Sequence, residues 1–176
     1  MIIKKFRKLS EIVAYFEDKK FRYAIKQSYR AELDTKYKKC YTLYKDLIRK
    51  NLIGSRIGQG NDKIVFEYSN DNSKVLKLFY SDLAFEDEKH NYKFLIKNGL
   101  KNLTPQMKFY DQYSIVEKVT LNHPLVRVES NPLFLKIEKD PGTRNFGTLN
   151  GRSVLMDLGS LNYEHIKENL EILKKI

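Results

Sequence analysis

Residues Ile64–Phe79, with the sequence IVFEYSNDNSKVLKLF, contain the feature from which the predicted fold follows. Two short runs of apolar and aromatic residues, Ile64–Tyr68 and Val75–Phe79, flank the polar segment Ser69–Lys74. Such runs are typical of strands, and a cluster of Ser, Asn and Asp between them is typical of a turn. The stretch therefore predicts a β-hairpin.

Lys77 lies inside the second apolar run, on the strand face that it shares with Val75 and Phe79. A cation on a buried apolar face needs a counter-charge. The residues that follow predict a helix over about 82–98, and its inward face carries one carboxylate, that of Glu88. We therefore expect Lys77 to pair with Glu88. The pair could be purely structural, or Lys77 could extend to the strand edge and reach solvent.

The other segments predict an α+β order. The expected helix begins after Ser81 and ends before Gly99. A strand at about 52–57 precedes the hairpin, and two strands near 107–110 and 113–119 follow the helix. We expect residues 120–139 to be irregular. Asn150-Gly151 predicts a second hairpin, between 146–148 and 153–156, and a last helix is expected over about 162–175.

The first 50 residues carry most of the net charge of +11. They hold 15 basic and 6 acidic residues, whereas residues 51–176 hold 18 and 16. A first helix is expected after Ser10 and a second over about 32–50, where Tyr37, Tyr41, Tyr44 and Ile48 have the spacing of one helix face. This spacing favours a helical arm packed on the body. The alternative is a surface for nucleic acid or an acidic protein.

Composition excludes several classes of protein. The chain has 176 residues, of which 41% are hydrophobic, so it can bury a core. No apolar run approaches the roughly 20 residues that span a bilayer, and the first residues do not resemble a secretory signal. Cys40 is the only cysteine, which excludes a disulfide framework. We expect a cytoplasmic protein without a membrane partner.

Two groups of residues have the pattern of a phosphate and metal site. Gly58 and Gly60 lie between two strands, where free amides could approach a phosphate, although an ordinary glycine turn would give the same pattern. Asn145 and Asp157 bracket the Asn150-Gly151 turn and should be close cross-strand neighbours. Their oxygen atoms suit magnesium, but residues of this kind often serve only in turns.

Taken in order, these residues resemble the protein-kinase-like superfamily over about 51–160. Asp140-Pro-Gly-Thr-Arg-Asn145 matches the catalytic-loop spacing Asp-x-x-x-x-Asn, and Asp157-Leu-Gly159 is similar to the Asp-Phe-Gly segment. The interval between the two segments is similar to that of RIO-type kinases and aminoglycoside phosphotransferases.

The resemblance implies a role for each matching residue at an ATP and magnesium site. Gly58 and Gly60 would cover the phosphates, and Lys77, held by Glu88, would bind the α- and β-phosphates. Val116 would be the gatekeeper of the adenine site.

The same resemblance assigns the adenine contacts, the metal ligands and the catalytic carboxylate. The carbonyl of Glu117 and the amide of Val119 would bind adenine. Asp140 would orient or deprotonate the accepting hydroxyl, while Asn145 and Asp157 would hold magnesium.

Some positions depart from the family pattern. Lys63 stands where the third glycine of the loop is expected, and Glu138-Lys139 replaces the His-Arg before the catalytic Asp. About twenty residues separate Val119 from Asp140, and 17 follow Gly159, so we expect a reduced C-lobe. The expected organisation is a helical extension over 1–50, a five-stranded antiparallel N-lobe with one helix over 51–119, and a reduced C-lobe over 120–176.

Three functions remain open. The first is an ATP- and magnesium-dependent phosphotransferase, acting on itself or on a protein Ser/Thr rather than on a small molecule. The second is a pseudokinase or kinase-fold binding module whose basic arm binds nucleic acid or an acidic protein. The third is a small α+β domain in which the motif matches are accidental.

Overall fold

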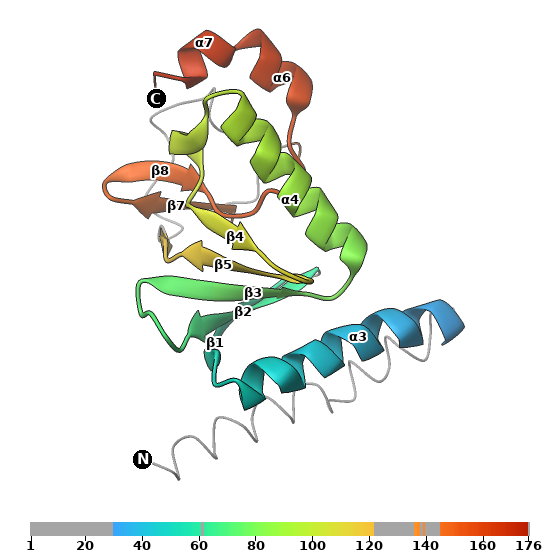
Figure 1. Cartoon of the computed structure of the whole chain (residues 1–176). Coiled ribbons are helices and arrows are strands. Elements are labelled where there is room, and N and C mark those ends of the chain that lie inside the picture. Colours follow the sequence, from blue (N-terminus) through green and yellow to red (C-terminus); the bar gives the residue numbers. More distant parts are fainter. Residues whose placement is uncertain (1–29, 61, 122–135, 138, 140–144, 176) are drawn as a thin grey trace.

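The computed structural model describes residues 30–60, 62–121, 136–137, 139 and 145–175. A five-stranded antiparallel sheet with the strand order β1-β2-β3-β5-β4 forms its centre (Figure 1). The strands are β1 (Ile53–Gln59), β2 (Lys63–Tyr68), β3 (Lys74–Phe79), β4 (Met107–Phe109) and β5 (Tyr113–Glu117). The predicted α+β class and the five strands are confirmed.

A smaller sheet and several helices complete the described structure. The second sheet has three strands in the order β6-β7-β8, namely β6 (Thr120–Leu121), β7 (Phe146–Leu149) and β8 (Arg152–Leu155). The helices are α3 (Arg30–Arg49), α4 (Asp82–Lys97), η1 (Lys101–Leu103), α6 (Tyr163–Glu168) and α7 (Leu170–Leu173). None of the helices in this part of the chain is long and apolar enough to cross a bilayer.

Strand β3 is buried on both of its faces, which explains why its sequence is almost continuously apolar. Leu76 and Leu78 belong to the apolar cluster that includes residues of α3. Val75 belongs to the other cluster, which includes Leu95 of α4. The alternation that we predicted around Lys77 is therefore present, and Lys77 lies on the face that α4 covers.

Helix α3 covers the face of the large sheet that carries Leu76 and Leu78 (Figure 1). Its buried side chains are Cys40, Tyr44 and Leu47, and the Tyr44 ring stacks on Phe66 of β2 at a centroid distance of 6.0 Å. A packed helix over about 32–50 is confirmed. The side chains of Tyr37 and Tyr41 and the helix expected after Ser10 lie outside the described residues.

The two ends of α4 match the predicted capping signals. The Ser81 side chain accepts a hydrogen bond from the Ala84 N–H, as an N-cap does. Gly99 has a φ of 76° and donates to the Ile96 carbonyl, while Leu100 donates to the Leu95 carbonyl. These two bonds form a Schellman motif, which ends the helix where a residue with positive φ is needed.

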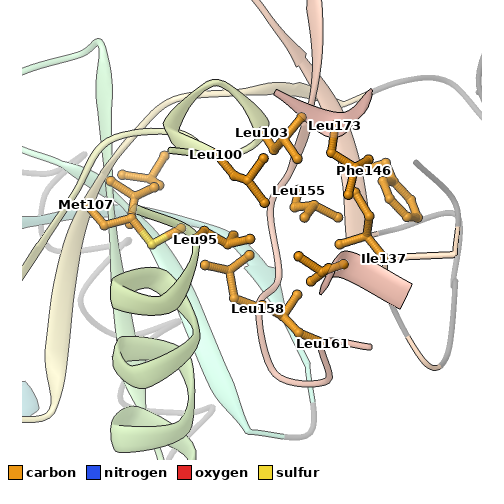
Figure 2. Packing of buried hydrophobic residues seen from close by; sticks show 13 residues of the cluster. Leu95, Leu100, Leu103, Met107, Ile137, Phe146, Leu155, Leu158, Leu161 and Leu173 are labelled. Carbon is orange, nitrogen blue, oxygen red and sulfur yellow. The ribbon is translucent and has the colours of Figure 1, made fainter. Parts of the chain in front are cut away.

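The second apolar cluster joins α4 to the C-terminal part of the chain (Figure 2). Leu95 and Leu100 lie at the end of α4 and just beyond it, and they share this cluster with Phe146 of β7, Leu155 of β8 and Leu173 of α7. Each of these side chains is at most 1% exposed. The cluster therefore holds the segment after β8 against the helix that carries Glu88.

Two predicted segments need correction. Residues 120–139 are not wholly irregular, because Thr120 and Leu121 form β6 and pair with Thr148 and Gly147. The last helix is not continuous either, because it is interrupted at Asn169. There the Asn169 side chain donates to the His165 carbonyl, and this local hydrogen bond competes with regular helix geometry.

Candidate functional site

Four charged side chains meet on the face of the large sheet that α4 covers. They are Lys63 of β2, Lys77 of β3, Glu88 of α4 and Asp157, which follows β8. The Lys77 Nζ lies 2.7 Å from Glu88 Oε1, so the predicted pair is present. The Lys63 Nζ donates to the other oxygen of Glu88, and it lies 2.7 Å from Asp157 Oδ1.

The strand register places the two lysines on one face of the sheet. Val65 is paired with Lys77, and Lys63 is paired with Phe79. Because directly paired residues and residues two apart share a face, Lys63 and Lys77 are diagonal neighbours. Both ammonium groups therefore reach the same helix, α4.

Glu88 is fully buried between the two lysines. It lies on the inward face of α4, three residues after Phe85, whose ring packs edge-on against Phe79 at a centroid distance of 5.5 Å. A buried carboxylate is stable only when its charge is paired and its lone pairs are hydrogen-bonded. The two ammonium groups, one on each oxygen, meet this requirement.

The segment 156–159 is attached to the sheet and to α4. The Lys77 ammonium donates to the Met156 carbonyl, and the Asn91 side chain of α4 donates to the Leu158 carbonyl. Asp157 Oδ1 also accepts the Gly159 N–H at 3.0 Å. The Asp-Leu-Gly segment is therefore held beside Lys77 by polar contacts on several sides.

Asp157 is the most exposed member of the cluster, with 38% of its side chain accessible. Its Oδ1 accepts both hydrogen bonds, and within the described part of the chain its Oδ2 accepts none. Within the described residues, one oxygen of Asp157 thus makes all of its hydrogen bonds, including the one to Lys63.

Burial and mutual attraction act in opposite directions on the pKa values of the cluster. Burial alone would lower the pKa of Lys63, but the carboxylates of Glu88 and Asp157 outweigh it and raise that pKa. Burial, together with the positive charge of Lys63, lowers the pKa of Lys77 despite its contact with Glu88. Burial would raise the pKa of Asp157, but the two lysines outweigh it and hold the pKa below the usual value.

The depressed pKa of Asp157 predicts a pH-dependent stability. The ionised carboxylate stabilises the fold above the unfolded-state pKa of about 3.9, and this contribution is lost as the pH falls through the lower, folded-state pKa. In urea unfolding, Asp157→Asn should therefore cost about 1–2 kcal/mol near pH 6, since the carboxylate is only partly buried.

The cost of Asp157→Asn should decrease as the pH falls below about 4, where the unfolded-state carboxyl takes up a proton, and it should disappear only below the depressed folded-state pKa. Asp87→Asn, at an exposed position of α4, is the matched control and should show a much smaller difference. A cost for Asp157→Asn that stays constant from pH 6 to pH 3 would mean that its ion pair does not support the fold.

Asn145 and Asp157, the predicted metal ligands, both lie at the open end of the β7–β8 hairpin. In the β7–β8 hairpin Phe146 is paired with Leu155, and the Met156 N–H donates to the Asn145 carbonyl at 2.7 Å. Asn145 therefore lies opposite Met156, one residue before Asp157. Asn145 and Asp157 are thus offset by one position across the hairpin, which agrees with the expectation of close cross-strand neighbours.

The remaining predicted residues occupy the ends of strands. Gly58 lies in β1, and Gly60 follows the strand and donates to the Lys63 carbonyl at 2.9 Å. Val116 is buried in β5, and Glu117 ends that strand. Val119 lies between β5 and β6. Asp140, the predicted catalytic carboxylate, lies outside the described residues.

Lys63 is the member of the site that the sequence analysis did not assign. It was noted only because it replaces a glycine of the expected loop. The hairpin alternation contains the missing signal, because Lys63 is two residues before Val65 and therefore shares the face of Lys77.

Comparison with known proteins adds no family assignment, since no protein-family model matches the sequence and no curated protein does.

Proposed function

We propose that this protein is an ATP- and magnesium-dependent phosphotransferase with a protein-kinase-like fold. The observation that carries the proposal is the buried Lys77–Glu88 pair next to Asp157. In protein kinases a lysine of the third strand is held by a glutamate of the following helix, and an Asp of a separate segment binds the metal. Lys77 on β3, Glu88 on α4 and Asp157 after β8 are in corresponding positions.

The two glycines at and just after the end of β1 support a phosphate site. Two other glycines have a structural reason. Gly151 has a φ of 77°, which other residues rarely adopt, and a Cβ at Gly147 would lie only 2.8 Å from the Thr120 carbonyl oxygen. Neither reason applies to Gly58 and Gly60, which have no positive φ and would meet no described atom closer than 4.0 Å. Glycine there leaves space for a ligand to approach the backbone.

The donor set near Asp157 fits magnesium. Magnesium is usually held by one or two protein carboxylates together with substrate phosphates, rather than by a complete protein cage. Asp157 Oδ2 accepts no hydrogen bond from the described residues. Asn145, at the start of the β7–β8 hairpin, is the second proposed ligand. Bound there, the ion would neutralise charge on the phosphates. No group of three or more metal-binding side chains is present in the described ranges.

The proposed adenine contacts lie where β5 ends. Val119 is the proposed donor to a ring nitrogen, and its N–H forms no backbone hydrogen bond to the described residues. Glu117 is the proposed acceptor through its carbonyl. Asp140 would orient the accepting hydroxyl, and we favour a protein acceptor, either the chain itself or another protein.

Thermal unfolding with nucleotide tests the proposal. A ligand that binds only the native state raises the midpoint, by about 2.7 kcal/mol of stability at 100 times its Kd. We expect ATP with magnesium at millimolar concentration to raise the midpoint of the wild-type protein. Lys108→Met, which removes an exposed lysine of β4, should keep the shift. An unchanged wild-type midpoint would contradict nucleotide binding.

A second candidate is a kinase-fold binding module without catalysis. The specific observation in its favour is that Lys63 already neutralises Asp157, the proposed metal ligand. On this alternative the basic residues 1–50 would bind nucleic acid or an acidic protein. Partner binding that falls steeply with salt, and that survives substitution of Lys77, would support the module.

A further inference from the structure

Lys63 adds a positive charge that the proposed phosphotransferase does not require. It is 8% exposed, and its ammonium contacts both carboxylates of the cluster. Two ammonium groups and two carboxylates make the cluster neutral without any bound ion. A site with Lys77 alone would instead carry one net negative charge and would need a metal to receive a polyphosphate.

The two ammonium groups also retain hydrogen-bond donors. A lysine ammonium has three N–H groups. Among the described residues Lys63 uses two of them, on Glu88 and Asp157, and Lys77 uses two, on Glu88 and the Met156 carbonyl. Because both lysines bind the same carboxylate, the two ammonium groups lie side by side, and the Lys63 ammonium also lies 5.4 Å from the centroid of the Phe79 ring.

Lys63 also binds one of the two oxygens of the carboxylate that a divalent ion would need. Its Nζ lies 2.7 Å from Asp157 Oδ1, which accepts the Gly159 N–H as well. An ammonium there links the carboxylate to any anion that the third N–H binds. A divalent ion between Asp157 and a phosphate would form the same link.

We propose that Lys63 is a second phosphate-binding residue that replaces part of the charge neutralisation of a divalent ion, so that the site binds a nucleoside triphosphate without metal. This inference rests on the proposed nucleotide site and specifies its ligand form. Lys63 and Lys77 together bind the phosphates, and Asp157 orients Lys63.

Calorimetric titration with ATP tests this, in excess chelator and in excess magnesium. Wild-type protein should bind ATP in chelator. Lys63→Met should weaken binding in chelator by about 10-fold or more, the scale of one charge-assisted hydrogen bond, and should change binding with magnesium much less. Lys63→Met keeps the Lys77–Glu88 pair, so the variant should fold, which circular dichroism checks. Lys108→Met removes an exposed lysine and should match the wild type in both conditions.

Two results would overturn the inference while the proposed function stands. One is wild-type protein that binds ATP only with magnesium, a result that does not depend on any variant. The other is a folded Lys63→Met protein with the wild-type ratio of the two affinities. Wild-type protein that binds ATP in neither condition would overturn both the nucleotide site and the role of Lys63.

Discussion

Replacing Glu88 by glutamine should lower the free energy of unfolding by about 3–5 kcal/mol, the cost of leaving buried charges without their partner. Glu88 is fully buried, and its two oxygens bind the ammonium groups of Lys63 and Lys77. Glutamine has nearly the same volume, so the loss measures charge rather than packing. Of all the substitutions in the cluster, this one should cost the most stability.

The lysine variants give the matched comparison. Lys77→Met leaves Glu88 paired with Lys63, and Lys63→Met leaves it paired with Lys77. Each should therefore cost only about 1–3 kcal/mol, in the range of one charged hydrogen bond. Urea unfolding at pH 7 measures all three. If Lys77→Met costs as much as Glu88→Gln, the carboxylate is not shared in the way the structure describes.

Lys77→Met and Asp140→Ala should each reduce phosphate transfer from ATP by about 100-fold or more, as loss of a preorganised charged group at a reacting centre does. Lys77 would position the α- and β-phosphates, and Asp140 would orient the attacking hydroxyl. Transfer of labelled phosphate to the protein itself and to a general protein acceptor measures the effect.

Lys74→Met is the matched control for Lys77→Met, because Lys74 lies on the same strand and pairs with Asp71 near the hairpin turn. It should transfer phosphate at the wild-type rate. Transfer that persists in folded Lys77→Met and Asp140→Ala proteins would refute the assigned roles.

Local signals in the sequence were enough to predict most of the large sheet and one ion pair. The hairpin over 64–79, the helix with its caps at Ser81 and Gly99, and the contact between Lys77 and Glu88 all depend on short-range alternation and spacing. Those patterns need only the residues of two adjacent elements, so one sequence is sufficient to find them.

Two of the missed features, the contact of Lys63 with Asp157 and the pairing of β6, depend on contacts between distant segments. Lys63 and Asp157 are 94 positions apart, and only the packed structure brings them together. The pairing of β6 with β7 is equally non-local. The break at Asn169 has a different cause, because a side-chain hydrogen bond competes with a helix that the apolar spacing alone would continue.

The central claim, that a nucleotide places its phosphates beside Lys77, is tested most directly by a chemical map. An ATP derivative with an acyl group on its terminal phosphate acylates a nearby lysine amine, forming an amide and releasing ATP. Mass spectrometry of the digested protein then identifies the modified lysine. We predict modification at Lys77 or Lys63, suppressed by excess unmodified ATP. Acylation spread over exposed lysines such as Lys108, and unaffected by excess ATP, would contradict the account.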